Sequence, residues 1–223
     1  METTPSDTTA VVFAGGGPDD LPTPIPEVIA ECPLRIAADA GADAMFQVDV
    51  TPHVVIGDLD SVSPPSLAWA RDAGAAIVEY PVDKDATDLE LALDYAVEHS
   101  ADRIVLVGGT GGRLDHLLGN ATLLASPRFA GITIVWESRD ATVRVCRPGA
   151  PAPVRGTVDD LVSLVPMGGD ATGVTTTGLR WRLDGRTLTA GTTLGISNRL
   201  ERPDASVSVA TGTLLVIHER IRP

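Results

Sequence analysis

Apolar and polar positions alternate in two different ways along this chain. Between residue 11 and about residue 136, short apolar runs rich in β-branched residues are separated by amphipathic segments. Such runs are typical of buried parallel strands, and the segments between them are typical of helices that cover a sheet. The front part is therefore predicted to be α/β with a mostly parallel sheet. The runs that we interpret as strands are AVVFAGG (10–16), LRIAADAG (34–41), HVVIGDLD (53–60), AAIVEYPV (75–82), DRIVLVGG (102–109) and GITIVWES (131–138).

Two of the predicted helices are well marked. Thr87 and Glu90 fit a capping box, which indicates that a helix starts there. A second helix is expected from about Leu114. Both carry an apolar stripe at helical spacing, which we expect to lie in the core. The stripes consist of Leu89, Ala92, Leu93, Ala96 and Val97 in the first helix, and of Leu117, Leu118, Ala121 and Leu124 in the second.

Beyond residue 140 the pattern changes to short segments in which apolar and polar residues alternate, separated by turn signals. We therefore expect an all-β sandwich over residues 141–223, after an α/β domain over residues 1–140. Within GLRWRL (178–183), Trp181 is interpreted as a core residue, with a stacking platform for a flat cationic ring as the alternative. RPGAPAPVRG (147–156) is rich in proline and glycine and predicts a loop. The segments expected to be strands are ATVRVCR (141–147), LVSLVPM (161–167), GLRWRL, RTLTAGTTL (186–194) and SVSVATGTLLVIHERI (206–221).

The net charge of the chain is −13, and it is unevenly distributed. Residues 1–140 hold 23 acidic and 7 basic residues, a net charge of −16, whereas residues 141–223 hold 7 acidic and 10 basic residues, a net charge of +3. This asymmetry of charge indicates two structural units with different functions. A surface this acidic would repel nucleic acid and anionic lipid, which are bound mainly through basic residues. A phosphate ligand in the front part would need a metal ion.

The chain shows no sign of a membrane span or of export. It has no run of 18 apolar residues. Its first nine residues, METTPSDTT, are polar and lead into no long apolar run, so we expect a frayed terminus rather than a signal peptide. The two cysteines, Cys32 and Cys146, lie far apart and are expected to be free thiols. These features favour a soluble, cytoplasmic protein.

Polar and glycine-rich clusters follow five of the predicted strands. The carboxyl ends of parallel strands meet at one edge of a sheet, where ligands bind in open α/β folds. We therefore expect all five clusters to contribute to one site. They are GGG (15–17), ADAG (38–41), GDLDS (57–61), VDKDATD (82–88) and GGTGGRLDH (108–116).

Aspartates are dense in two of these clusters. Asp58 and Asp60 lie two positions apart, and Asp83, Asp85 and Asp88 follow the next predicted strand. Like charges at short distances raise the pKa of one another unless a cation intervenes. Mg²⁺ suits this role beside phosphates, because it takes one or two carboxylates together with substrate oxygens. The alternative is that each aspartate merely caps a helix or stabilises a turn.

The glycine-rich turn GGTGGR (108–113) opens a predicted helix. It lacks the Lys-Ser/Thr pair of a P-loop and the third glycine of the GxGxxG fingerprint. Free N–H groups at a helix N-terminus nevertheless bind phosphate, and Arg113 could add a bidentate contact. A tight turn without a ligand is the alternative. Lys84, the only lysine, is either a solvated side chain or a phosphate contact.

Taken in order, GDLDS, DKDATD, GGTGGRLDHLLGN and a β-rich end that contains GLRWRL and ISN resemble the thiamine pyrophosphokinase family over the whole chain. The resemblance implies an α/β nucleotide- and metal-binding domain (1–140) and a β-sandwich domain that binds thiamine (141–223). It also implies a homodimer with active sites between subunits, and Mg²⁺ with ATP as the donor. The implied reaction converts ATP and thiamine to AMP and thiamine diphosphate.

The resemblance further implies roles for the residues at matching positions. Asp58, Asp60 and Asp88 would be the metal-binding and catalytic carboxylates. The resemblance does not identify the group, if any, that accepts the hydroxyl proton, and we take one of the aspartates as the candidate. Trp181 would stack on the aminopyrimidine ring of thiamine. The other residues implied in ATP or thiamine binding are Asp39, Gly41, Lys84, Asp85, Thr87, Gly109, Gly112, Arg113, Asp115, Ser197 and Asn198.

The chain also departs from the pattern of the family. Many members have Ala-Asp-Gly-Gly-Ala-Asn where this chain has ADAGAD, so Asp39 and Gly41 carry over but Ala40 and Asp43 do not. Gly195 stands where some members have a hydroxyl side chain. The contacts of those positions are therefore not carried over.

Three other functions remain open at this point. The first is a pyrophosphokinase that acts on another hydroxymethyl heterocycle, such as a pterin. The second is a regulatory module that binds a nucleotide without turnover. The third is metal-dependent hydrolysis without an acceptor, which would leave the β-rich domain without a role.

Overall fold

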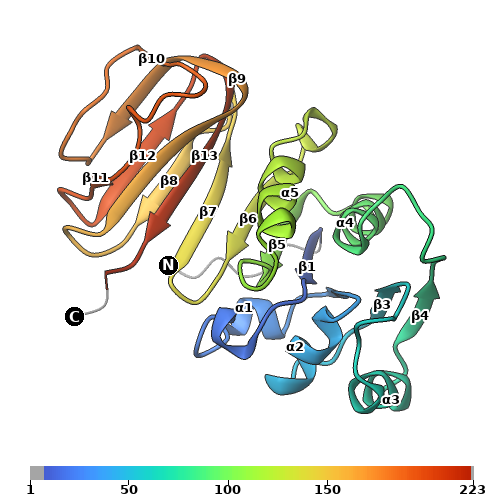
Figure 1. The fold of residues 1–223 in the computed structure, drawn as a ribbon. Helices are drawn as coiled ribbons and strands as arrows, with labels where there is room; N and C mark the ends of the chain where they lie inside the picture. The colour runs from blue at the N-terminus through green and yellow to red at the C-terminus, as the bar shows by residue number, and fades with distance from the viewer. Residues whose placement is uncertain (1–7, 222–223) are drawn as a thin grey trace. The chain divides into compact units, whose positions relative to one another are not determined.

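The computed structural model describes residues 8–221, so most of the predicted frayed terminus (1–9) lies outside the described residues (Figure 1). The chain divides into two compact units. One runs to Asn120 and continues over Gly131–Arg139, and the other comprises Ala121–Ala130 and the chain from Asp140 onward. Ala121–Ala130 joins the second unit because the buried guanidinium of Arg147 donates to backbone carbonyls in this segment.

The first unit contains a sheet whose strands all pair in parallel, in the order β4-β3-β2-β1-β5-β6. Because β1 pairs with both β2 and β5, the chain builds the sheet outward on one side of β1 and then returns to the other side. This reversal is the switch point at which open α/β sheets bind ligands. The strands are β1 (Thr9–Phe13), β2 (Leu34–Ala38), β3 (Val54–Gly57), β4 (Ala76–Glu79), β5 (Arg103–Val107) and β6 (Thr133–Glu137).

Helices cover both faces of this sheet. The first three helices contribute buried side chains to one apolar cluster together with alternate residues of β1, β2, β3 and β5. Helix α4 contacts β1, β2 and β3 but contributes nothing to that cluster, which places it on the opposite face. The helical elements are η1 (Pro18–Asp20), α1 (Glu27–Ala30), α2 (Gly41–Gln47), α3 (Pro64–Asp72), α4 (Asp88–Glu98), α5 (Leu114–Leu124) and η2 (Pro127–Phe129).

The second unit is antiparallel and β-rich. Its long strand β9 pairs with β13 through its first part and with β12 through its last part, so β9 takes part in two sheets (Figure 1). Buried residues of both sheets form one apolar cluster, as in a sandwich. The strands are β7 (Ala141–Cys146), β8 (Ala152–Arg155), β9 (Leu161–Thr177), β10 (Arg186–Leu188), β11 (Asn198–Arg199), β12 (Asp204–Ser208) and β13 (Thr211–Glu219).

The predicted fold class is confirmed. Three local predictions in the second unit were wrong, and of the strand predicted over residues 186–194 only Arg186–Leu188 is a strand. GLRWRL is not a strand but an irregular segment with a single β-bridge at Leu179. Trp181 is 56% exposed rather than buried in the core. The predicted loop 147–156 contains β8, which pairs only with β12 and therefore tolerates Pro153 at an edge position.

Some residues predicted to be buried are exposed. Strand β4 lies at the edge of its sheet, so its ends are exposed and its middle is only half-buried. Val97 on α4 and Leu118 on α5 were expected in the core, but they are 38% and 60% exposed. Helical spacing gives the direction of a side chain and does not show whether a neighbour covers it. No helix among residues 8–221 is long and apolar enough to cross a bilayer.

Candidate active site

A pocket of about 370 Å³ lies in the first unit, at the carboxyl ends of its strands. Its walls come from the segments that follow β1, β2, β3, β4 and β5, so the structure brings together the five clusters predicted to meet. The residues that line it are Ala14, Gly15, Gly16, Ala38, Asp39, Ala40, Ser61, Val82, Lys84, Ala86, Thr87, Asp88, Leu89, Gly109, Gly111, Gly112, Arg113, His116 and Asn120.

Carboxylates from two adjacent strand ends converge here. Asp39 follows β2, whereas Asp58 and Asp60 follow β3, and one oxygen of each lies within 4.8 Å of the other two. Asp39 is buried, and its Oδ1 has no hydrogen-bond partner among the described residues. Burial, together with the nearby charges of Asp88 and Asp58, raises the pKa of Asp39. The cluster therefore holds more negative charge than its protein partners neutralise.

Lys84 is the cation that faces these carboxylates. Its Nζ lies 2.5 Å from Asp58 Oδ2 and 3.1 Å from Asp88 Oδ1. The hydrogen bond from Lys84 lowers the pKa of Asp58. Burial lowers the pKa of Lys84, but the hydrogen bonds to Asp58 and Asp88 outweigh it and raise the pKa overall. Lys84 is thus held in its charged form at the edge of the pocket.

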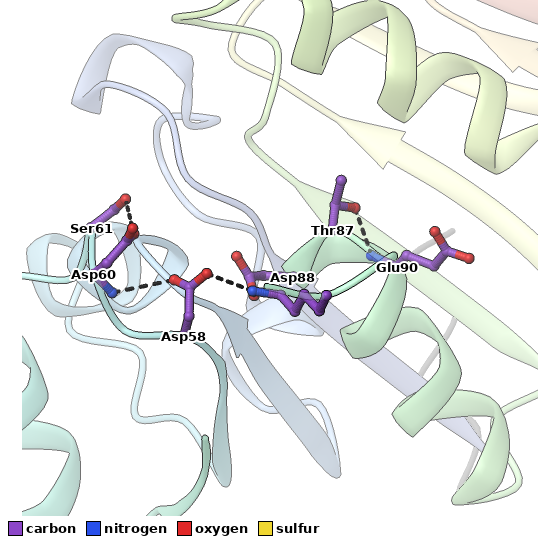
Figure 2. A network of polar contacts seen from close by, with 7 residues as sticks. Asp58, Asp60, Ser61, Thr87, Asp88 and Glu90 are labelled. Carbon is purple, nitrogen blue, oxygen red and sulfur yellow. Dashed lines mark hydrogen bonds and ion pairs between the residues drawn. The ribbon is translucent and has the colours of Figure 1, made fainter. Parts of the chain in front are cut away.

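The start of α4 places Asp88 in the site. Thr87 is the N-cap residue, and its side chain accepts a hydrogen bond of 3.2 Å from the N–H of Glu90, as predicted from the capping box (Figure 2). A Cβ built on Gly57 would lie 3.0 Å from both Asp39 Cβ and Asp88 Oδ1. The absence of a side chain at Gly57 therefore lets both carboxylates approach the end of β3.

The loop after β3 orders its own aspartates. The N–H of Asp60 donates to Asp58 Oδ1 over 3.4 Å, and Ser61 Oγ donates to Asp60 Oδ1 over 2.8 Å (Figure 2). Asp60 itself is exposed. Asp58 and Asp60 lie beside the pocket rather than among its lining residues, and Ser61 lines it.

Residues 39–43 connect the carboxylate cluster to the core. Gly41 starts α2, and a Cβ there would collide with the carbonyl of Phe13 at the end of β1, so the close packing requires glycine. Asp43, which departs from the family pattern, accepts hydrogen bonds from the N–H and the hydroxyl of Ser63. Asp43 therefore fastens α2 to the N-cap of α3.

The glycine-rich turn forms the wall of the pocket after β5. Gly109, Gly112 and Arg113 line the pocket, and Gly112 has a positive φ of 83°. Arg113 and Asp115 are both exposed and form an ion pair with an N–O distance of 2.6 Å. Asp115 does not line the pocket itself.

The predicted thiamine-side residues lie in the second unit and contact one another. Asn198 is buried and brackets Trp181, because its Oδ1 accepts from the N–H of Trp181 at 3.1 Å and its Nδ2 donates to the carbonyl of Trp181 at 2.8 Å. The N–H of Ser197 donates to Ser163 Oγ over 3.0 Å. Asn198 thus fixes the segment that presents the exposed indole of Trp181.

The residues that line the pocket differ in part from those that the sequence predicted for the site. Asp83 and Asp85 are exposed and do not line the pocket, although the sequence grouped them with Asp88. His116 and Asn120, one turn apart on α5, line it and were not singled out. Their spacing on the predicted helix was the only available signal.

The carboxylate cluster fits a hard divalent cation. Asp39 supplies a buried oxygen that has no hydrogen-bond partner within residues 8–221, and Asp58 and Asp60 supply oxygens within reach of it. Oxygen ligands of this kind suit Mg²⁺. A parallel sheet with glycine-rich turns at its switch point is the arrangement in which open α/β proteins bind ligands, and the carboxylates along the same edge are candidate cation ligands.

Comparison with known proteins identifies the family. Residues 25–136 match the family model for the thiamin pyrophosphokinase catalytic domain, and residues 154–215 match that for the thiamin pyrophosphokinase vitamin B1 binding domain. The chain is 33% identical to thiamine pyrophosphokinase from Bacillus subtilis (strain 168), over 92% of this chain and 96% of the relative. It is 30% identical to thiamine pyrophosphokinase 1 from Oryza sativa subsp. japonica, over 78% of this chain and 75% of that protein. The chain therefore belongs to the thiamine pyrophosphokinase family.

Solved structures agree with this assignment. The crystal structure of thiamine pyrophosphokinase from Bacillus subtilis superposes with a TM-score of 0.83 at 29% identity, covering 96% of this chain and 100% of that chain. A family protein from Enterococcus faecalis gives a TM-score of 0.79 at 27% identity, with 96% and 99% covered. The arrangement of an α/β part followed by an antiparallel β-rich part is thus that of the family.

Proposed function

We propose that this protein transfers the diphosphoryl group of ATP to the hydroxyl group of thiamine. The thiamine oxygen would attack the β-phosphorus, the bond from the β-phosphorus to the oxygen that bridges it to the α-phosphorus would break, and AMP would leave with that oxygen. Membership of the thiamine pyrophosphokinase family supports this reaction. The single structural observation that carries it is the convergence of Asp39, Asp58 and Asp60 beside a pocket walled by glycine-rich turns.

We assign the metal ligands from this convergence. Asp58, Asp60 and Asp88 are the predicted ligands, and the geometry adds Asp39 as a further candidate. Mg²⁺ bound there would neutralise phosphate charge and help to align the two reacting oxygens. The same aspartates are the candidates to accept the hydroxyl proton, because they are the bases nearest the cation site.

The basic residues of the pocket complete the site for the phosphates. Lys84 can redirect its ammonium group from Asp58 to a phosphate oxygen, because its Nζ already lies at the wall of the pocket. Arg113 is exposed beside the same wall and offers a bidentate contact. Gly109 and Gly112 allow close approach of the phosphate chain to the backbone.

The second unit supplies the proposed thiamine contacts. The indole of Trp181 is exposed, as a stacking surface must be, and tryptophan is the best side chain for a flat cationic ring. Asn198 holds the backbone on both sides of that indole. Ser197 has a positive φ of 62°, which turns the chain next to this segment.

We further propose that the protein works as a cytoplasmic homodimer with active sites between subunits, with nucleotide binding in residues 1–140 and thiamine binding in residues 141–223. Leu114 and Leu118, one turn apart on α5, are 69% and 60% exposed, and an apolar pair of this size favours cover by a second copy. Mixing Asp58→Asn and Trp181→Ala protomers tests this assembly. At a thiamine concentration below the KM of Trp181→Ala, activity above that of either variant alone supports shared sites, whereas mixing gives no such gain if each chain holds a complete site.

The function is tested by incubating the protein with Mg-ATP and thiamine and measuring AMP and thiamine diphosphate together. We expect equal amounts of both products, and loss of both in Asp58→Asn but not in Asp72→Asn, an exposed control on α3. Product formation with a pterin alcohol but not with thiamine would favour the alternative acceptor. Binding of Mg-ATP without AMP release with any alcohol would support a regulatory module, and AMP without a second product would support hydrolysis.

A further inference from the structure

Asp20 lies outside the segment that matches the catalytic-domain model and makes unusual contacts. It ends η1, in the glycine-rich loop that follows β1, and is only 8% exposed. Its Oδ2 accepts hydrogen bonds from the N–H of Thr110 at 2.7 Å and from the N–H of Gly111 at 3.0 Å. Its Oδ1 accepts from the hydroxyl of Thr110. A buried carboxylate therefore binds the turn after β5 from 90 residues away in the sequence.

The same turn is held at two further points. Trp136 Nε1 donates to the carbonyl of Gly108 at 2.5 Å, and Asn120 Nδ2 donates to the carbonyl of Gly109 at 3.1 Å. Both side chains are buried. Residues 108–111 are thus fixed through donors and acceptors of their backbone, by side chains that come from three separate elements.

This arrangement divides the N–H groups of the turn into two sets. The N–H groups of Thr110 and Gly111 are occupied by Asp20, so they are not free to bind a phosphate. Gly112 is different, because a Cβ built there would meet no atom within 4 Å. Gly112 and Arg113 line the pocket next to this open space. A phosphate that binds to this turn would therefore use N–H groups other than those that Asp20 holds.

We infer that Asp20 is a positioning residue, which presets the glycine-rich turn 108–112 in the shape that binds the nucleotide. Gly108, Gly109 and Gly112 all have positive φ values, which glycine adopts readily. Because glycine also adopts many other backbone conformations, this turn is flexible unless other contacts restrain it. If the turn became ordered only when the nucleotide binds, the entropy cost of ordering it would lower the affinity. A turn that is ordered beforehand avoids that cost. Asp20 is not among the residues that line the pocket and acts through Gly111, which lines it. Gly16 also lines the pocket and packs closely against Asp20, because a Cβ built on Gly16 would lie 2.6 Å from Asp20 Oδ2.

The inference rests on the nucleotide binding proposed above, and its test does not require turnover. Binding of a non-hydrolysable ATP analogue with Mg²⁺ is measured by calorimetry for the wild type, Asp20→Ala and Asp20→Asn. We expect affinity to fall at least about tenfold in Asp20→Ala and at least about threefold in Asp20→Asn, whose amide can accept through its oxygen but also presents N–H groups to the donors of the turn. Asp19→Asn is the matched control, because the side chain of Asp19 is 94% exposed, and its affinity should stay within about twofold.

Two further readouts separate positioning from a general loss of stability. The KM for ATP should rise in Asp20→Ala while the KM for thiamine stays unchanged, and amide hydrogen exchange over residues 108–113 should become faster. Unchanged nucleotide affinity in a folded Asp20→Ala protein overturns the inference. If Asp20→Ala does not fold, unchanged nucleotide affinity in a folded Asp20→Asn protein overturns it instead. A wild-type protein that binds the analogue but makes no thiamine diphosphate would refute the proposed function alone.

Discussion

Replacing Lys84 with methionine removes the cation that neutralises the carboxylate cluster while it keeps a side chain of similar length. Lys84 Nζ lies 2.5 Å from Asp58 and 3.1 Å from Asp88, and the three side chains are 13%, 11% and 23% exposed. Breaking a fully buried ion pair from one side costs about 3–5 kcal/mol, whereas an exposed pair contributes about 0–1 kcal/mol. These side chains are mostly but not fully buried, so we expect Lys84→Met to lower the free energy of unfolding by about 2 kcal/mol in metal-free buffer.

Mg²⁺ should reverse much of this loss. A cation that binds only the folded protein stabilises it by about 2.7 kcal/mol at 100 times its dissociation constant. In Lys84→Met, Mg²⁺ no longer competes with an ammonium group for Asp58, so the gain in stability should be larger than in the wild type. Urea unfolding with EDTA and with Mg²⁺ measures both effects.

The control for Lys84→Met is Arg71→Met, which also removes one positive charge from the first unit but at an exposed position at the end of α3. It should change the free energy of unfolding by less than about 0.5 kcal/mol. If Lys84→Met is as stable as the wild type without metal, and Mg²⁺ affects both proteins equally, then Lys84 does not neutralise the carboxylate cluster as described above.

Burial raises the pKa of Asp160, but hydrogen bonds led by that from His218 outweigh it and lower the pKa overall. The hydrogen-bonded pair therefore stabilises the fold fully above about pH 4, which is the pKa of an aspartate in the unfolded chain, and this stabilisation is lost as the pH falls through the lower pKa of the folded state. Urea unfolding between about pH 7 and pH 2 measures the free energy of unfolding against pH. Asp160→Asn should remove the part of the fall in stability that this pair causes. Trp181→Ala should raise the KM for thiamine about 3- to 30-fold, and the free energy of unfolding should change by less than about 0.5 kcal/mol because the indole is exposed. Asn198→Ala should raise the KM for thiamine but not for ATP, and should cost about 1 kcal/mol of stability because it leaves partly buried peptide groups of residue 181 without their hydrogen bonds.

The sequence predicted the position of the site because that position follows from a general rule. Parallel strands end at one edge, so Asp88 at the start of α4 lines the same pocket as the glycine-rich turn after β5, and Asp58 and Asp60 after β3 lie beside it. The cap at Thr87 was equally predictable, because its partner lies only three residues away. Local signals of this kind require no knowledge of packing.

The sequence could not predict contacts between backbone groups and distant side chains. Asp20 acts through N–H groups 90 residues away, and any residue type except proline offers an N–H, so Thr110 and Gly111 gave no sign of this contact. Trp181 was misassigned because alternation in GLRWRL imitates a strand. In the structure the peptide groups of Trp181 bond to the side chain of Asn198 instead of to a neighbouring strand.

The most direct test of the account follows the phosphorus atoms of ATP into the product. The protein is supplied with Mg²⁺, thiamine and ATP labelled in separate experiments at the β- and at the γ-phosphorus, and the products are separated. Both labels should appear in thiamine diphosphate, and neither should appear in AMP. Transfer of the γ-label alone would show that the protein moves a single phosphoryl group, and would contradict the attack at the β-phosphorus on which the account depends.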